Sequence, residues 1–321
     1  MKIVVLEKTV LGEDVSLEGL EQLGEVTFYG NTKYDQIGPR LKEADIAVIN
    51  RSPMEEGTLK DVTNLKLVCV TGTGVNPIDQ EYMKKRGIPV TNVRDYSTYS
   101  VCQHTFAMLF YVMEHLRYFD EYVKEGNYVE HKKQTYMSKK FSQLAGMTYG
   151  ICGLGAIGKQ VAKVAEAFGA KIIYYSTSGN NSCPDYERVS FDELLKRSDV
   201  ISIHAPLTKQ SKGLFNKEAF EKMKESAIII NAGRGAIIEE EALCYALKEN
   251  KIAAAALDVL EKEPMPVDHP LLSLQDSNCL FITPHIAWAS KEARQTVVDE
   301  VCMTIESFYQ GKIRNLIWEQ K

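Results

Sequence analysis

Three polar side chains late in the sequence have the types needed for acid–base chemistry on a small carboxylic acid. Arg234 lies between two glycines just after one apolar stretch, and His285 closely follows another. Arginine can bind a carboxylate with two parallel hydrogen bonds, and histidine can pass a proton near neutral pH. Glu263 could orient that histidine and fix which of its nitrogens carries the proton. Each residue also has an ordinary explanation, as a solvated turn arginine, a core histidine or a surface acid, but together they indicate a catalytic site.

A glycine-rich loop adds a possible phosphate-binding turn. Residues 153–158, Gly-Leu-Gly-Ala-Ile-Gly, follow an apolar run and precede a segment with the apolar spacing of a helix. Strand, glycine loop and helix form the context of a dinucleotide-binding fingerprint. Gly153 would permit the tight turn, Gly155 would let the backbone approach a pyrophosphate, and Gly158 would let the helix pack closely. The helix N-terminus would attract the phosphates, while a purely structural turn stays the alternative.

The residue expected to select the cofactor is a serine. An acidic residue at the end of the second strand usually holds the adenosine ribose 2′-hydroxyl and selects NAD. Ser176 occupies this position, and no basic residue follows it before Arg188 to receive a 2′-phosphate. We therefore expect NAD, with NADP as the alternative.

The rest of the pattern predicts the elements that would position these groups. Residues 1–95 alternate short apolar runs with helical segments, and from residue 146 the alternation returns with longer apolar strands. Such runs are typical of parallel sheets covered on both faces, and right-handed crossovers make each unit doubly wound. The expected strands are 3–6, 26–29, 46–49, 67–70, 149–152, 171–175, 200–203, 227–230, 253–257 and 280–282. The expected helices are 17–23, 34–42, 79–85, 101–118, 159–168, 191–197, 217–223, 239–249 and 291–308.

Between the two alternating regions lies a segment of different character. Residues 119–143 are rich in tyrosine and lysine without a clean period, which predicts an extended, irregular arm. Exposed aromatic side chains are frequent at interfaces, so we expect the arm to contact a second copy of the chain. Packing on its own domain is the alternative. A polar break at 96–100 predicts a hinge before the helical stretch.

Composition narrows the class of protein. The chain has 321 residues, a net charge of −5 and 45% hydrophobic residues, without a basic run or an apolar stretch of membrane-spanning length. These features argue against a nucleic-acid or membrane partner. Seven scattered cysteines without a C-x-x-C motif are typical of buried free thiols in a reducing cytoplasm. No residue is assigned to a metal.

Six segments, taken in order, resemble the D-isomer-specific 2-hydroxyacid dehydrogenases over essentially the full chain. They are T-G-T-G-V-N-P-I-D (71–79), G-L-G-A-I-G (153–158), H-A-P-L-T (204–208), I-I-N-A-G-R-G (229–235), A-L-D-V-L-E-K-E-P (256–264) and T-P-H-I-A-W (283–288). Residues 101–105, and 285–288 followed by 292–294, further resemble the glycerate dehydrogenase, or hydroxypyruvate reductase, branch.

The resemblance implies an α/β fold of two doubly wound parallel-sheet domains. A Rossmann coenzyme domain, 99–289, with a dimerisation arm near 119–145, would be inserted into a flavodoxin-like substrate-binding domain, 1–98 and 290–321. The protein would be a cytoplasmic homodimer. The two domains would close about hinges near 97–99 and 288–290.

The resemblance also implies a reaction and its residues. The reaction would reduce a small 2-keto acid, preferably hydroxypyruvate or glyoxylate, to the D-2-hydroxy acid. The alternatives are a D-lactate-type or phosphoglycerate-type dehydrogenase, or a dinucleotide-sensing binding protein without turnover. The implied catalytic residues are Arg234, Glu263 and His285, and the substrate-binding residues are Arg51, Thr73, Gly74, Arg234 and His285. The implied cofactor-binding residues are Gly153, Gly155, Ala156, Ile157, Gly158, Ser176, His204, Pro206, Ala232, Asp258 and Ala287, with Asp258 on the nicotinamide carboxamide.

Overall fold

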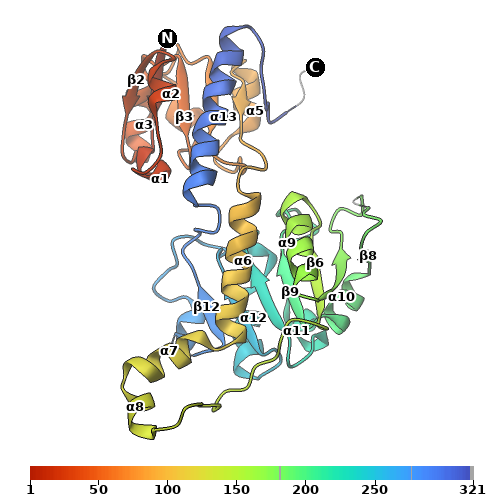
Figure 1. Cartoon of the computed structure of the whole chain (residues 1–321). Coiled ribbons are helices and arrows are strands. Elements are labelled where there is room, and N and C mark those ends of the chain that lie inside the picture. Colours follow the sequence, from red (N-terminus) through yellow and green to blue (C-terminus); the bar gives the residue numbers. More distant parts are fainter. Residues whose placement is uncertain (181, 276, 319–321) are drawn as a thin grey trace. The chain divides into compact units, whose positions relative to one another are not determined.

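The chain forms two compact units, each built on its own parallel sheet (Figure 1). The computed structural model describes residues 1–180, 182–275 and 277–318. The first unit comprises Met1–Ser97 and the segment from Ala289 onward, and the second comprises Thr98–Trp288. These boundaries fall one residue before those expected from the sequence. Among the described residues, no helix is long and apolar enough to cross a membrane.

The first unit holds a five-stranded sheet with the order β2-β1-β3-β4-β5, which is the flavodoxin-like order. Its strands are β1 (Lys2–Val5), β2 (Glu25–Phe28), β3 (Ile46–Ile49), β4 (Leu67–Val70) and β5 (Val90–Thr91). Its helices are α1 (Lys8–Leu11), α2 (Glu18–Glu21), α3 (Tyr34–Leu41), α4 (Glu56–Leu59), α5 (Gln80–Lys85) and α13 (Lys291–Tyr309). Every residue of β3 and β4 is buried, because α13 covers one face of the sheet and α3 to α5 cover the other.

The second unit holds a seven-stranded parallel sheet with the order β12-β11-β10-β9-β6-β7-β8. Its strands are β6 (Thr148–Cys152), β7 (Lys171–Tyr175), β8 (Glu187–Arg188), β9 (Val200–Ile203), β10 (Ile228–Asn231), β11 (Ala254–Leu257) and β12 (Leu280–Ile282). The order reverses at β6, as in a Rossmann fold. The predicted class, two doubly wound parallel-sheet domains, is therefore confirmed.

Helices cover both faces of this second sheet, and most of them lie where the sequence predicted. On one face pack α6 (Thr98–Met113) and α9 (Ala156–Ala167). On the other pack α10 (Phe191–Arg197), α11 (Lys217–Lys222) and α12 (Glu240–Lys248). Two short 3₁₀ helices, η1 (Gly235–Ile237) and η2 (Pro270–Leu274), follow β10 and precede β12.

Two expectations about the segment before β6 were wrong. The single helix expected over 101–118 is broken at His115, whose φ of +53° lies in the left-handed region that a continuing helix excludes. The expected irregular arm near 119–145 instead contains most of α7 (Leu116–Lys124) and all of α8 (Asn127–His131) before it becomes irregular. Part of its aromatic content is internal, since Tyr122 and Tyr136 stack with ring centroids 4.1 Å apart.

Candidate active site

The polar residues expected to do chemistry in the second unit follow the carboxyl ends of neighbouring strands. In parallel sheets these ends meet at one edge, which is where α/β proteins bind ligands. The glycine loop follows β6 and Ser176 follows β7, whereas His204, Arg234, Asp258 and His285 come after β9, β10, β11 and β12. The fold therefore places residues that are more than a hundred positions apart along a single edge.

At this edge His285 is paired with Glu263. The Nδ1 atom of His285 lies 2.7 Å from Oε2 of Glu263. The other oxygen, Oε1, accepts a hydrogen bond of 3.0 Å from the backbone N–H of Leu260, so the carboxylate is held at both ends. The carboxylate accepts a hydrogen bond from the Nδ1–H group, and this leaves Nε2 as the nitrogen that exchanges a proton with a reactant. The pair can serve as a general acid in one direction and a general base in the other.

The loop that carries Arg234 is braced by a buried asparagine. Asn231, at the end of β10, donates from Nδ2 to the Arg234 carbonyl and accepts at Oδ1 from the Gly233 N–H, each at 3.0 Å. The guanidinium itself donates to the Gly233 carbonyl at 2.8 Å and is partly exposed. Its remaining N–H groups can bind a carboxylate or a carbonyl oxygen.

A close backbone contact joins the loop after β10 to the loop after β11. A Cβ added to Gly235 would lie only 1.8 Å from the carbonyl carbon of Leu260. Only glycine permits this approach. Because the Leu260 N–H binds Glu263, the contact ties the position of Arg234 to that of the carboxylate.

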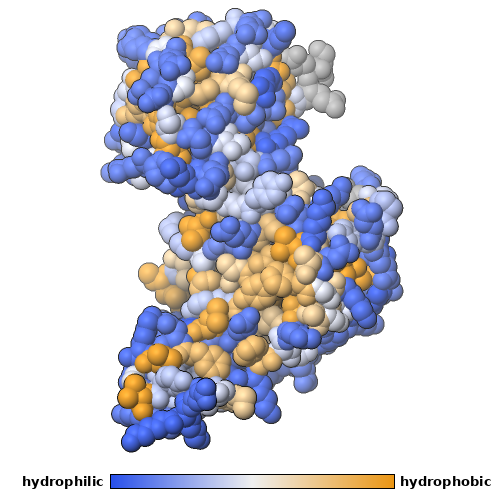
Figure 2. Space-filling view, viewed as in Figure 1, coloured by the Kyte–Doolittle hydropathy of each residue, from blue (hydrophilic) through white to orange (hydrophobic). Residues whose placement is uncertain are grey.

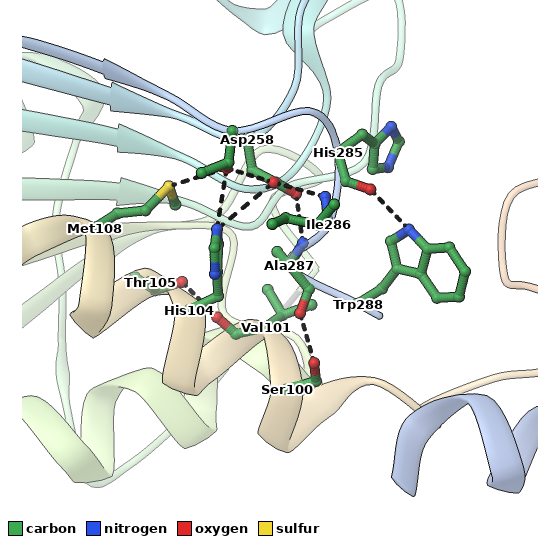
Figure 3. A network of polar contacts seen from close by, with 11 residues as sticks. Ser100, Val101, His104, Thr105, Met108, Asp258, His285, Ile286, Ala287 and Trp288 are labelled. Carbon is green, nitrogen blue, oxygen red and sulfur yellow. Dashed lines mark hydrogen bonds and ion pairs between the residues drawn. The ribbon is translucent and has the colours of Figure 1, made fainter. Parts of the chain in front are cut away.

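The buried carboxylate of Asp258 fixes the turn that carries His285 (Figure 3). Its Oδ1 accepts hydrogen bonds from the Thr283 hydroxyl at 2.6 Å and the Ile286 N–H at 2.8 Å. Its Oδ2 accepts from the Ala287 N–H at 2.9 Å. The backbone N–H of His285 also donates to the Asp258 carbonyl, and its φ of +56° is left-handed. Such backbone is unusual for a residue other than glycine, and these bonds stabilise it here.

His104 on α6, which no motif of the sequence marked as part of the site, extends this network. Its Nε2 lies 3.0 Å from the Thr283 hydroxyl oxygen and 3.6 Å from Oδ1 of Asp258 (Figure 3). Because that hydroxyl hydrogen goes to Asp258, Nε2 must be the donor toward Thr283. One helical turn earlier, the Ser100 hydroxyl donates to the Ala287 carbonyl at 2.6 Å. The one signal in the sequence was a histidine within a strongly apolar helical stretch.

The geometry of the glycine loop fits a dinucleotide phosphate. Gly153 has a φ of +95°, and a Cβ there would lie 2.6 Å from the backbone of Ala205. A Cβ on Gly158 would lie 2.3 Å from the Gly153 carbonyl oxygen, so this glycine lets α9 pack against the loop. Gly155 differs, because nothing lies within 4 Å of where its Cβ would be. It caps α9, whose first N–H groups, from Ala156 onward, have no partner within the helix.

Two further polar atoms lie at this edge without a partner among the described residues. The Oγ of Ser176 is buried after β7, and Nδ1 of His204 is enclosed after β9. His204 Nε2 lies 3.0 Å from the Ser202 hydroxyl, and burial lowers the pKa of the imidazole to about 3, so the ring is neutral. Unpaired buried polar atoms are costly unless a ligand or water satisfies them. Both atoms therefore suit the ribose side of a dinucleotide site.

The other residues expected to contact the cofactor lie in these same loops. Pro206 is exposed just after β9, Ala232 is partly buried after β10, and Ala287 is buried in the turn around Asp258. Ile157 is partly buried in the first turn of α9.

The expected substrate residues of the first unit share the carboxyl edge of its sheet. Arg51 is exposed after β3, and its backbone N–H donates to Glu7 at 2.9 Å. Thr73 and Gly74 follow β4, where the Thr73 hydroxyl donates to the Val93 carbonyl at 2.8 Å. Within the described residues, the N–H groups of Thr73 and Gly74 donate to no backbone carbonyl, which leaves them available to an anion.

Fold and site together define a dinucleotide-dependent dehydrogenase with an acid–base pair at the carboxyl edge of a Rossmann sheet. Comparison with known proteins gives the family. Residues 106–287 match the model for the NAD-binding domain of D-isomer-specific 2-hydroxyacid dehydrogenases. The chain is 38% identical over 323 residues to hydroxypyruvate reductase of Blautia hydrogenotrophica, covering 99% of each protein. The chain belongs to the D-isomer-specific 2-hydroxyacid dehydrogenase family.

Two solved structures share its fold throughout. D-Lactate dehydrogenase from Aquifex aeolicus, complexed with NAD and lactic acid, gives a TM-score of 0.86 at 29% identity and covers 100% of both chains. An acyclic imino acid reductase in complex with NADPH and D-Arg also gives 0.86 at 29% identity, covering 99% of this chain and 100% of its own. Structures similar to this one thus bind either nicotinamide dinucleotide.

Proposed function

We propose that the protein reduces hydroxypyruvate to D-glycerate or glyoxylate to glycolate, acting as a glycerate dehydrogenase, or hydroxypyruvate reductase. The His285–Glu263 pair, at the same sheet edge as Arg234 and the glycine loop, is the observation that carries this proposal. The name of the Blautia relative supports the choice of substrate.

In this mechanism each side chain of the second unit has a separate task. When bound, the nicotinamide supplies a hydride to the keto carbon. Arg234 binds the substrate carboxylate and carbonyl oxygen and stabilises the negative charge that develops on that oxygen. His285, protonated at Nε2, donates that proton to the carbonyl oxygen of the substrate, and Glu263 stabilises the imidazolium. A general acid of this kind typically raises the reaction rate by ~10²–10⁴-fold. In the reverse direction Nε2 takes the hydroxyl proton.

The remaining residues bind and orient. Asp258 would hold the nicotinamide carboxamide, and the glycine loop would hold the pyrophosphate of NAD, the dinucleotide we propose. His204, Pro206, Ala232 and Ala287 would line the cofactor. Thr73 and Gly74 would donate backbone N–H groups to the substrate carboxylate, and Arg51 would contact the substrate.

We also propose that the protein is a homodimer in the cytoplasm. The arm exposes the large apolar side chains of Val123, Tyr128, Val129, Met137 and Phe141, and Leu116, just before the arm, is also exposed. Figure 2 shows orange, hydrophobic areas over this lower part of the molecule. Exposed apolar groups gathered on one segment favour burial against another protein surface. Light scattering on the purified chain should give the mass of two copies, and a single-copy mass would rule the dimer out. The proposed cytoplasmic location is supported by the free cysteine thiols, which are typical of proteins in a reducing compartment.

A panel of keto acids tests the activity. We expect purified protein to oxidise the reduced dinucleotide fastest with hydroxypyruvate or glyoxylate, more slowly with pyruvate, and slowest with phosphohydroxypyruvate. Fastest turnover of pyruvate or of the phosphorylated acid would instead support a D-lactate-type or phosphoglycerate-type enzyme. Dinucleotide binding without turnover of any keto acid would overturn the enzyme proposal in favour of a sensor.

A further inference from the structure

We propose that Glu240 is a positioning residue of the proposed reaction, and that the buried pair it forms with His269 fixes the backbone that orients the catalytic carboxylate of Glu263. The proposal rests on the proposed function, since it deepens the role given there to the His285–Glu263 pair. Both residues act through the main chain of the loop after β11, and neither has a part in the mechanism described above.

The pair is buried next to the loop after β11. Glu240 is the first residue of α12, and His269 directly precedes η2. Nε2 of His269 lies 2.8 Å from Oε2 of Glu240, and the two side chains are 3% and 13% exposed. Nδ1 of His269 accepts a hydrogen bond of 3.3 Å from the Leu271 N–H, so the ring carries its proton on Nε2 and donates a hydrogen bond to the carboxylate. A carboxylate removed from water is costly unless hydrogen bonds satisfy it, and this bond supplies one of them.

The second oxygen of Glu240 holds the backbone of that loop. Oε1 accepts a hydrogen bond of 2.8 Å from the Glu261 N–H. The neighbouring N–H, that of Leu260, donates to Oε1 of Glu263 at 3.0 Å. Two carboxylates, one from α12 and one from the loop itself, therefore bind consecutive N–H groups. Because peptide units are planar, only the two backbone dihedral angles of Leu260 separate the peptide that Glu240 holds from the one that binds Glu263.

The peptide that Glu240 holds is also packed against Gly235. A Cβ added to this glycine would lie 1.8 Å from the Leu260 carbonyl carbon, which belongs to that peptide. Loss of the hydrogen bond from Glu240 would let the peptide rotate, and rotation would displace the Leu260 N–H that holds Glu263. The 2.7 Å contact between Glu263 and Nδ1 of His285 would loosen in turn.

The arginine that binds the substrate is braced independently of this pair. Asn231 holds the loop of Arg234 through hydrogen bonds with the Arg234 carbonyl and the Gly233 N–H, each at 3.0 Å. Loss of the Glu240 bond should therefore affect proton transfer by His285 more than binding of the 2-keto acid. This difference separates a positioning role from a general loss of folded structure, which would weaken both.

Replacing Glu240 with glutamine keeps the shape of the side chain and removes one acceptor. An amide has a single oxygen, so it cannot accept from both the Glu261 N–H and His269. We expect the single-turnover rate constant with NADH and hydroxypyruvate to fall by about tenfold, while KM for hydroxypyruvate stays within about twofold. His269→Leu should show the same loss. His269→Gln keeps an N–H donor for the carboxylate and should retain the native rate within about threefold.

A double-mutant cycle shows whether Glu240 acts through Glu263. In a Glu263→Ala background the catalytic carboxylate is absent, so Glu240→Gln should slow the reaction by less than about twofold further. A further loss of about tenfold in that background would mean that the two effects are independent and would overturn the proposal.

Glu241→Gln is the matched control, because this carboxylate is the next residue of α12 and is exposed. Every variant is assayed below its thermal unfolding midpoint. The control should react at the native rate, and a loss equal to that of Glu240→Gln would also overturn the proposal.

Nuclear magnetic resonance of protein labelled with ¹⁵N in its histidines supplies a readout without turnover. The His285 imidazole signal, assigned by its absence in His285→Ala, should shift in Glu240→Gln, whereas the signal of His204, which lies after β9, should not. An unchanged His285 signal in Glu240→Gln would overturn the proposal. If that signal shifts but the native protein turns over no keto acid, the proposed function fails while the placement of Glu263 by Glu240 stands. The two failures are therefore distinguishable.

Discussion

Replacing Glu263 with glutamine isolates what its negative charge contributes to the acid–base pair. The substitution keeps the size and shape of the side chain. In the native protein one carboxylate oxygen accepts from His285 Nδ1 at 2.7 Å and the other accepts from the Leu260 N–H at 3.0 Å. An amide has a single oxygen, so it can keep only one of these bonds. If the oxygen stays with Leu260, the amide NH₂ faces Nδ1 and favours the tautomer with its proton on Nε2.

The expected size of the effect follows from this geometry. A hydrogen bond to a charged group contributes about 1.5–3 kcal/mol, and each 1.36 kcal/mol in a barrier is about tenfold in rate. The side chains are 31% exposed for His285 and 25% for Glu263, so solvent screens the pair only in part. We therefore expect Glu263→Gln to slow proton-coupled hydride transfer by about 10–100-fold, while substrate binding through Arg234 changes little.

The assay is the single-turnover rate constant for oxidation of the reduced cofactor by hydroxypyruvate, with circular dichroism confirming that the variant is folded. Glu261→Gln is the control, since this nearby carboxylate is exposed and its nearest cation, Lys212, is 3.8 Å away. The control should react at the native rate. A Glu263→Gln rate within twofold of the native rate, or an equal loss in both variants, would refute the reasoning about the pair.

Three further outcomes follow from the geometry. Gly155→Ala should fold normally and weaken dinucleotide binding in calorimetry, because nothing lies within 4 Å of the new Cβ. Gly153→Ala should lower the thermal unfolding midpoint, because Gly153 has a φ of +95° and its new Cβ would lie 2.6 Å from backbone atoms. Equal unfolding midpoints for the two variants would contradict this. Burial lowers the folded-state pKa of His204 from 6.5 to about 3, so the unfolded chain binds an extra proton between these pH values. The unfolding free energy measured with urea should therefore fall as the pH drops from about 6.5 toward 3, and it should fall less in His204→Gln. Parallel pH curves for the two proteins would contradict this. Thr283→Val removes a donor to Asp258 and should lower the unfolding free energy by about 1–3 kcal/mol; no change would show that the hydroxyl does not stabilise the turn.

The fold could be predicted because its signal is local and repeated. Strands such as β3, β4 and β9 are buried on both faces and therefore appear as unbroken apolar runs. The two strands missed, β5 and β8, are two residues long, too short to produce a pattern. The break at His115 was missed because apolar residues continue on both sides of it, and only its backbone angle ends the helix.

The candidate site was only partly predictable, because several of its contacts join distant residues. Motifs identified Arg234, Glu263 and His285 and predicted that the last two pair, whereas the 2.7 Å geometry of that contact depends on the loop after β11. The contact between His104 and Thr283 spans 179 positions and leaves no trace in local spacing.

The central claim is that this chain transfers a hydride to a 2-keto acid and protonates the resulting oxygen through His285. The most direct measurement incubates purified protein with hydroxypyruvate and NADH and determines the amount and the chirality of the glycerate formed. The account predicts one D-glycerate for each NADH oxidised, and a loss of at least about 100-fold in rate for His285→Ala. L-Glycerate, no glycerate, or a near-native rate in His285→Ala would contradict it.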